Sequence, residues 1–258
     1  MDLELTDKVV VITGGSDGLG LALARRLVGE GAAVAVCGRD EERLAAAVAS
    51  LQELGGDVLG QQADVARDAD IAALVESVVA RWGRIDGIVH NAGRSAAVRL
   101  ESSDDALWEE DFQLKLMGAV RLTRRALPQL KASGGAALFT LAMAAKAPGA
   151  GSAPSSVLRA AGMALMKALS KELAPDGIRV NAVLIGLIES GQWVRAAAAA
   201  GQDVSEFYGG LAEGYGIPLG RVGRSDEFAD VAAFLLSARA SYLTGAAINL
   251  DGGLSPAV

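Results

Sequence analysis

The sequence predicts an α/β fold with a single doubly wound parallel sheet that carries helices on both faces. Short runs rich in Val and Ile alternate with alanine-rich, helix-periodic runs along the chain. Hydrophobic residues make up 51% of the 258 residues, which suits strands that are buried on both faces. No linker rich in Pro, Gly or Ser divides the chain, so we expect one domain over residues 1–258.

The first predicted element is a strand at Lys8–Thr13, because β-branched residues dominate this run. A glycine turn, Gly14–Gly20, follows, then a helix-periodic stretch, Leu21–Glu30, and a second strand, Ala33–Cys37. Glycine has no Cβ, so the N–H groups of such a turn can approach a pyrophosphate at the positive end of the helix. The βαβ unit therefore predicts a dinucleotide site. The alternative is a tight turn that uses glycines for structural reasons alone.

Composition limits the function classes. A net charge of -7 and a pI near 4.9 argue against nucleic acid or an anionic membrane as a partner. The N-terminal residues MDLELTDK do not form a secretory signal, and Lys146 ends the longest apolar run, Ala136–Ala145, so we expect no spanning helix and a cytoplasmic location. The only cysteine, Cys37, and the only histidine, His90, are interpreted as structural. We expect no metal site.

The glycine spacing, GxxxGxG in Thr13–Gly20 (TGGSDGLG), resembles the cofactor turn of the short-chain dehydrogenase/reductase family. Later segments match family landmarks in the same order: Asp64-Val65, His90–Gly93 (HNAG), Gly177–Ala182 (GIRVNA) and Asp251–Gly253 (DGG). The resemblance spans essentially the whole chain and implies a Rossmann-like fold with a nicotinamide dinucleotide cofactor. It implies cofactor contacts at Gly14, Ser16, Asp17, Gly18, Leu19, Gly20, Arg39, Asp64, Val65, Asn91, Ala92, Gly93, Arg159, Gly186, Ile188 and Ser190.

The end of the second strand indicates which cofactor is preferred. Gly38 stands where family members that prefer NAD carry an acid, and Arg39 follows it. A carboxylate there would bind a ribose 2′-OH and repel a 2′-phosphate, whereas an arginine offers that phosphate two donors. We therefore expect NADP(H) to be preferred over NAD(H). Against this, Arg39 can simply cap the loop before Asp40–Glu42, and Asp17 adds negative charge inside the turn.

The catalytic positions implied by the resemblance are all changed. The family uses a tyrosine, a lysine one helical turn later that stabilises its phenolate, a serine, and an asparagine on the preceding helix. Here these positions hold Ser155, Arg159, Ala142 and Lys115, respectively. A serine hydroxyl is a far weaker acid than a phenol, an arginine stays protonated, and an alanine donates nothing. We therefore do not expect the family's unmodified proton transfer.

Lys115, Ser155 and Arg159 remain the candidate catalytic residues. We hypothesise that Lys115 and Arg159 both face the nicotinamide pocket, where burial and mutual repulsion lower the Lys115 pKa toward neutrality. Lys115 would then act as an acid or as an amine nucleophile. The alternative is that Lys115 extends to solvent from a helix over Asp105–Leu130.

Residues 188–218 correspond to the substrate lid of the family. Gly186 and Ser190 resemble its PGxxxT segment, with Ile185 in place of the proline. Aromatic residues of the lid either line an apolar substrate pocket, in which case Tyr208 or Tyr215 supplies the missing proton donor, or they only pack the lid down.

The helix expected over Ser155–Lys171 has a face of small residues, and Ser241–Asp251 resembles the strand and tail through which relatives form tetramers. We expect a homotetramer, with a dimer as second choice. Three functions stay open. The first is an atypical NADP(H)-dependent oxidoreductase acting on a small apolar carbonyl or alcohol. The others are a non-redox isomerase, dehydratase or lyase, and a catalytically silent nucleotide-binding subunit.

Overall fold

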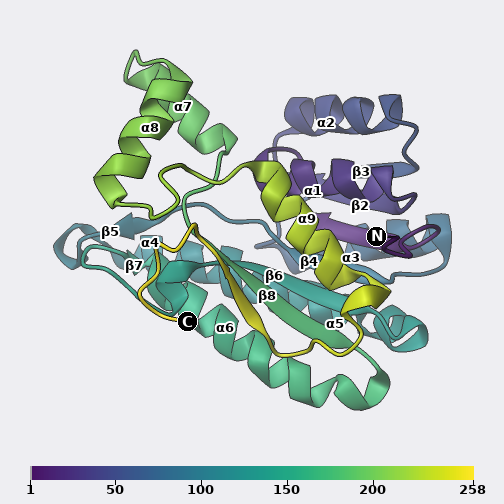
Figure 1. Ribbon diagram of the computed structural model, residues 1–258. Helices are drawn as coiled ribbons and strands as arrows, with labels where there is room; N and C mark the ends of the chain where they lie inside the picture. The colour runs from purple at the N-terminus through teal and green to yellow at the C-terminus, as the bar shows by residue number, and fades with distance from the viewer. Residues whose placement is uncertain (1) are drawn as a thin grey trace.

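The computed structural model describes residues 2–258 and is built on a seven-stranded sheet in the order β3-β2-β1-β4-β6-β8-β9, with every neighbouring pair parallel (Figure 1). The strands are β1 (Val9–Thr13), β2 (Ala33–Gly38), β3 (Val58–Gln62), β4 (Gly87–His90), β6 (Ala136–Ala142), β8 (Arg179–Ile185) and β9 (Ala247–Leu250). A separate antiparallel pair joins β5 (Ala97–Val98) to β7 (Ala153–Pro154). The predicted fold class is confirmed.

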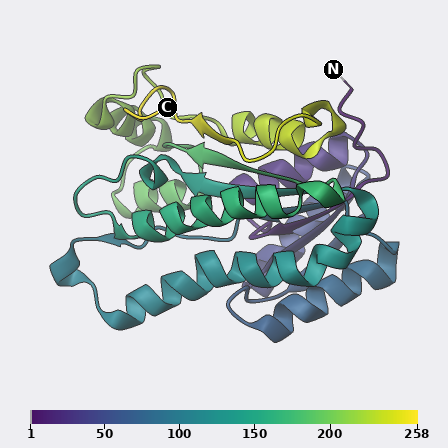
Figure 2. The same cartoon turned by 90° about the horizontal axis from the view of Figure 1, so that it is seen from below.

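Helices cover both faces of the sheet (Figure 2). One face packs against α1 (Gly18–Gly29), α2 (Glu41–Glu53) and α9 (Ser225–Leu236). The other packs against α3 (Asp68–Trp82), α5 (Gly118–Ser133) and α6 (Ser155–Glu172). The remaining helices are α4 (Asp105–Phe112), α7 (Gly191–Ala199) and α8 (Val204–Tyr215), with short 3₁₀ turns at Leu100–Ser102, Met143–Ala145, Ala174–Asp176 and Ala238–Ala240.

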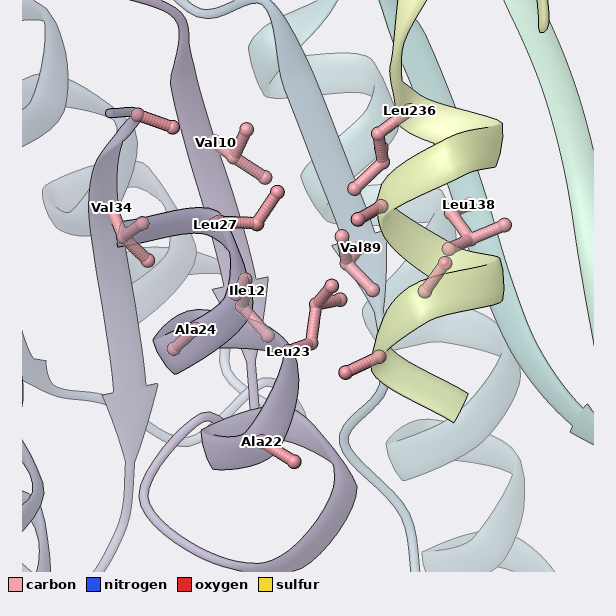
Figure 3. Packing of buried hydrophobic residues seen from close by; sticks show 14 of the residues in the cluster. Val10, Ile12, Ala22, Leu23, Ala24, Leu27, Val34, Val89, Leu138 and Leu236 are labelled. Carbon is pink, nitrogen blue, oxygen red and sulfur yellow. The ribbon is translucent and has the colours of Figure 1, made fainter. Parts of the chain in front are cut away.

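The apolar strand runs are explained by burial on both faces. Figure 3 shows Val10 and Ile12 of β1 facing Leu23 and Leu27 of α1, with Leu236 of α9 beside them, and all five side chains are buried. The intervening valines of β1 belong to the core of the opposite face. Because both faces are apolar, the strand sequence shows no polar alternation.

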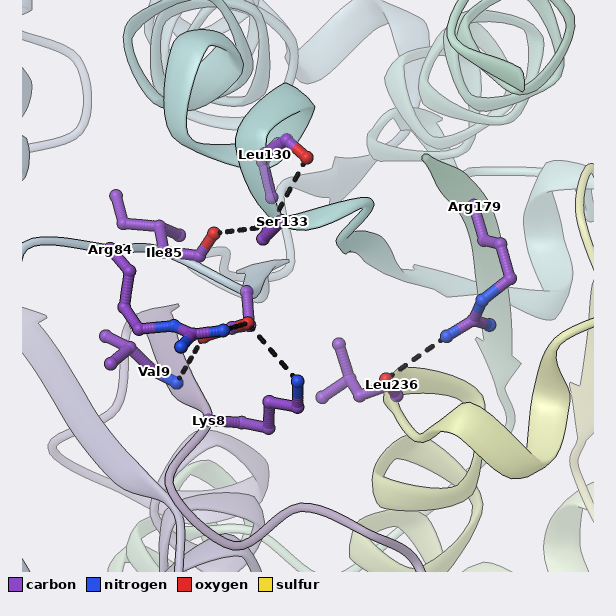
Figure 4. Close-up of polar contacts among 9 residues, drawn as sticks. Lys8, Val9, Arg84, Ile85, Leu130, Ser133, Arg179 and Leu236 are labelled. Atoms are coloured by element: carbon purple, nitrogen blue, oxygen red, sulfur yellow. Dashed lines mark hydrogen bonds and ion pairs between the residues drawn. The ribbon is translucent and has the colours of Figure 1, made fainter. Parts of the chain in front are cut away.

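The amino-terminal edge of the sheet is held by polar contacts (Figure 4). Arg84 donates to the carboxylate of Asp86, which also accepts from the backbone N–H of Val9. The Ser133 hydroxyl donates to the carbonyl of Ile85, and Arg179 donates to backbone carbonyls at the end of α9. These groups fasten helix ends and strand starts, and the opposite, carboxyl-terminal edge is the one that carries the cleft described below.

The helix expected over Asp105–Leu130 is present as one helical stretch over residues 105–133. A π-helical turn at Gln113–Met117 lies inside it, between α4 and α5. A π turn adds a residue to the helical repeat and so changes the direction of the side chains within it. Lys115 lies in the middle of this turn.

The segment predicted as a lid, residues 188–218, contains α7 and α8. Figure 1 shows these two helices side by side, standing away from the sheet. Within residues 2–258, no helix is both long and apolar enough to span a bilayer.

Candidate functional site

A cleft of about 500 Å³ lies at the carboxyl ends of the strands, and its wall includes the segments that follow β1 and β4. The chain reverses its winding between these two strands, and this is where doubly wound sheets bind ligands. Most of the predicted cofactor contacts line the cleft: Gly14, Ser16, Asp17, Gly18, Leu19, Arg39, Asp64, Val65, Asn91, Ala92, Gly93, Arg159, Gly186, Ile188 and Ser190.

Gly20 is the exception among these predictions, because it does not line the cleft. A Cβ at this position would stand 2.3 Å from the carbonyl oxygen of Gly14, so Gly20 serves close packing of α1 on the turn. The side-chain amide of Asn91 donates to the carbonyls of Thr13 and Gly14 and fixes the same turn. These contacts fix the shape of the glycine turn, which faces the cleft at the N-terminus of α1.

Gly38 leaves space that a neighbouring hydroxyl fills. A Cβ on Gly38 would lie 2.7 Å from Ser16 Oγ, so a longer side chain there would require Ser16 to move. Arg39 lines the cleft next to Gly38, and so does Arg43 in the first turn of α2, which the sequence analysis missed. Two guanidinium groups therefore flank this corner at the end of β2, and that of Arg43 pairs with the carboxylate of Asp40 at 2.9 Å.

Asp17 does not leave an uncompensated negative charge in the glycine turn. Its carboxylate accepts from the N–H of Gly18, which caps α1, and pairs with Arg195 of α7 at 3.1 Å. Arg195 also lines the cleft. The negative charge of Asp17 is therefore balanced by Arg195, a residue of the lid segment that was not predicted from the sequence.

Lys115 is buried, so the alternative that it extends to solvent is wrong. Its side chain is 4% exposed and its Nζ lies 2.6 Å from Asp111 Oδ1 in an ion pair within one helix. Asp111 itself is fully buried. The second contact of Lys115 Nζ is Ser155 Oγ, at 2.9 Å.

The pKa of Lys115 is lowered from 10.5 to about 8, with burial as the main cause. The hydrogen bond to Asp111 opposes this shift, and the charges of Arg159 and Arg94 add to it. The direction agrees with the hypothesis from the sequence, although burial contributes more than repulsion. Near pH 8 the Lys115 side chain is therefore divided between ammonium and amine.

Lys115 and Arg159 occupy different places in the wall. Arg159 lines the cleft, lies beside Gly93 and donates to the carbonyl of Thr140. Lys115 lines a smaller neighbouring cavity of about 20 Å³, whose wall Arg159 shares. Lys115 therefore reaches the cleft only through its hydrogen bond to Ser155, which lines the cleft directly.

Tyr208 and Tyr215 lie outside the lining of the cleft, so the suggestion that one of them donates a proton there is not supported. Tyr208 packs against the small core of the lid segment with Ala212 and Ile217, and burial raises its pKa. Tyr215 is 57% exposed. The packing alternative holds for Tyr208, and Trp193 is the lid aromatic that lines the cleft.

The structural interpretation of His90 and Cys37 is consistent with their surroundings. His90 packs on Phe139 at 4.4 Å between ring centroids and its Nε2 lies 3.0 Å from Thr123 Oγ1. Burial lowers the pKa of His90 to about 3 and raises that of Cys37 to about 11. Neither group titrates near neutral pH.

The most important residue that the sequence analysis missed is Asp111. The sequence contains one indication of this pair, because Asp111 and Lys115 are four residues apart in a helical stretch and such residues face each other. Nothing in the spacing showed that the pair is buried.

Comparisons with known proteins give the family. A family model described as enoyl-(acyl carrier protein) reductase matches residues 14–255. The 3-oxoacyl-(acyl-carrier-protein) reductase of Chlamydia pneumoniae is 32% identical over 269 residues, covering 99% of this chain and 100% of the relative.

Solved structures agree over the full length. A short-chain oxidoreductase from Pseudomonas aeruginosa PAO1 containing an atypical catalytic center has 36% identity and a TM-score of 0.94 in its apo form, with 100% of both chains covered. L-sorbose reductase from Gluconobacter frateurii, complexed with NADPH and L-sorbose, has 34% identity and a TM-score of 0.95, again with 100% of both chains covered. The chain belongs to the short-chain dehydrogenase/reductase family.

Proposed function

We propose that this protein is an NADP(H)-dependent oxidoreductase that interconverts a small carbonyl compound and its alcohol, with Lys115 and Ser155 replacing the proton donor of the family. The observation that carries the proposal is the contact of 2.9 Å between Lys115 Nζ and Ser155 Oγ. It connects a buried amine of lowered pKa to a hydroxyl in the cleft wall.

The residues of the cleft fit a nicotinamide dinucleotide. The glycine turn lies at the N-terminus of α1, where backbone N–H groups favour a pyrophosphate. Arg39 at the end of β2 suits a 2′-phosphate, and Arg43, which pairs with Asp40 at 2.9 Å, adds a second guanidinium group to the same corner. Thr140 Oγ1 is buried without a hydrogen-bond partner in the described chain and lines the cleft. When bound, the cofactor would supply or accept the hydride.

Relatives support the same cofactor. L-sorbose reductase was solved with NADPH, and so was a short-chain oxidoreductase from Pseudomonas aeruginosa PAO1 with an atypical catalytic center, at 36% identity and a TM-score of 0.92. The first is named a reductase of L-sorbose and the second an oxidoreductase. A carbonyl substrate in the cleft agrees with its apolar lining by Leu114, Ala142 and Ile185.

The proton path follows from the contacts. In the direction of reduction, the Ser155 hydroxyl protonates the oxygen of the substrate, and the Lys115 ammonium returns a proton to Ser155 Oγ across 2.9 Å. In the direction of oxidation, the neutral amine of Lys115 accepts a proton through Ser155. A serine alone is too weak an acid, and the lysine behind it removes that limitation. Asp111 stabilises the ammonium form in both directions.

Calorimetric titration with NADPH and, in parallel, NADH tests the cofactor assignment. We expect NADPH to bind more tightly, and Arg39→Ala to weaken NADPH binding about tenfold while leaving NADH nearly unchanged, since one charge-assisted contact is worth about 1.4 kcal/mol or more. Lys131→Ala on the far end of α5 is a control that removes a cation outside the cleft. If neither nucleotide binds, the oxidoreductase proposal is wrong.

A further inference from the structure

Asp111, Lys115 and Ser155 form a connected series of carboxylate, amine and hydroxyl. Lys115 Nζ donates to Asp111 Oδ2 at 2.7 Å and lies 2.9 Å from Ser155 Oγ. Only the hydroxyl end of the series reaches the large cleft. A base behind a hydroxyl, itself held by a third group, is the arrangement that activates a serine for attack on an acyl carbon.

We propose that Ser155 is also a nucleophile, and that the cleft catalyses acyl transfer from small activated esters with Lys115 as general base. Ser155 Oγ forms a bond to the acyl carbon while its proton passes to the neutral amine of Lys115. The bond from that carbon to the alcohol oxygen then breaks, and the Lys115 ammonium protonates the leaving alcohol. A water molecule repeats the sequence on the acyl-serine and releases the acid.

The electrostatics of the series allow the base to be neutral. Burial lowers the pKa of Lys115, and the guanidinium groups of Arg159 and Arg94 act in the same direction, while Asp111 opposes them. A neutral amine has two N–H groups and one lone pair, so it can donate to Asp111 and still accept from Ser155. The ammonium formed during attack faces the Asp111 carboxylate, which stabilises it.

The surroundings of Ser155 also favour the negative charge that develops on the acyl oxygen. Ser155 is the first residue of α6, a helix of 18 residues, so the positive end of the helix dipole lies at the reacting hydroxyl. Arg159, one turn further along α6, lines the same cleft. Both features stabilise an oxyanion beside Ser155.

This activity is independent of hydride transfer, so it can be tested without any nucleotide. The full chain is treated with a fluorophosphonate probe between pH 6.5 and 9.5, and the adduct is located by mass spectrometry. The reaction joins Ser155 Oγ to phosphorus and expels fluoride. We expect one adduct per chain, on Ser155, with a rate that rises with pH and levels off above about pH 8. Hydrolysis of p-nitrophenyl acetate should follow the same profile.

Variants test whether Lys115 activates Ser155 or whether Ser155 reacts only because it is exposed in the cleft. Ser155→Ala should give no adduct. The double variant Asp111→Asn/Lys115→Met removes the base without leaving a buried carboxylate alone. Its labelling should be slower by a factor of about 100 or more, while its circular dichroism stays that of the native protein. Ser156→Ala and Lys167→Met, on the same helix and outside the cleft lining, should label like the native chain.

Two results would overturn the proposal. One is the absence of an adduct on Ser155 of the native chain at pH 9. The other is an unchanged labelling rate in the folded double variant, which would show that Ser155 reacts without Lys115. Neither result bears on NADPH binding, which calorimetry tests separately, whereas the second result would also count against the relay from Lys115 to Ser155 in the oxidoreductase proposal.

Discussion

The buried pair of Asp111 and Lys115 predicts a pH-dependent loss of stability in the variant Asp111→Asn. The substitution keeps the shape of the side chain but removes its charge, and Asp111 is fully buried. At pH 6, the Lys115 ammonium must then stay buried without a counter-ion or lose its proton.

The size of the effect follows from the pKa of Lys115. Taking a proton from a group of pKa about 8 at pH 6 costs about 3 kcal/mol, which agrees with the roughly 3 kcal/mol that breaking a buried ion pair costs at the lower end of its range. At pH 9 the lysine is mostly neutral in the native protein, so only one weakened hydrogen bond is lost, about 1 kcal/mol. The difference in unfolding free energy between native protein and variant should therefore shrink as pH rises through 8.

Urea unfolding followed by circular dichroism at pH 6 and pH 9 measures this difference. Asp176→Asn is the matched control, because Asp176 pairs with Lys131 at 2.9 Å where each side chain is about a third or more exposed to solvent, and such pairs contribute at most about 1 kcal/mol. Equal losses for Asp111→Asn at both pH values would refute the assignment of a charged Lys115 as the cause.

Four further predictions follow from the structure. The folded pKa of Lys115, about 8, lies below its ordinary value of 10.5, so folding releases a proton and unfolding free energy rises between these pH values; the folded double variant Asp111→Asn/Lys115→Met should lack about 3 kcal/mol of that rise in urea titrations. Gly38→Asp should weaken NADPH binding in calorimetry at least tenfold, because the new side chain meets Ser16 and adds a negative charge; unchanged affinity would contradict the placement of the 2′-phosphate. Arg195→Ala should speed nucleotide release in stopped-flow measurements by no more than about fivefold, since its pair with Asp17 is exposed. Light scattering should give the mass of four chains, and a monomer would exclude the expected assembly.

The fold was predictable because its signals are local and repeated. The run from Lys8 to Thr13 and the glycine turn after it define a strand and a helix start by themselves, and the order of strands and helices then fixes a doubly wound sheet. Most predicted cofactor residues follow the ends of strands, and parallel strands bring their carboxyl ends to one edge. Gly20 was assigned to the cleft because spacing does not show which glycine faces a ligand and which allows close packing.

The chemistry of the site was predictable only in part. Lys115, Ser155 and Arg159 were named as candidates from the resemblance. The direction of the Lys115 side chain depends on the π turn, which no residue pattern predicted. The role of Asp111 depends on its burial, which residue spacing does not show, and the contact of Lys115 with Ser155 joins residues 40 positions apart. The Asp17 pair with Arg195 joins residues 178 positions apart, so no local pattern could reveal it.

The central claim is that Lys115 exchanges the proton through Ser155 during carbonyl reduction. It is tested most directly by the pH dependence of NADPH oxidation with a ketose and a ketoacyl thioester, the carbonyl classes named for relatives. We expect reduction to slow as pH rises through about 8 and alcohol oxidation to quicken over the same range, with both rates about 100-fold lower in a folded Lys115→Met variant. An unchanged turnover and pH profile in that variant would contradict the account.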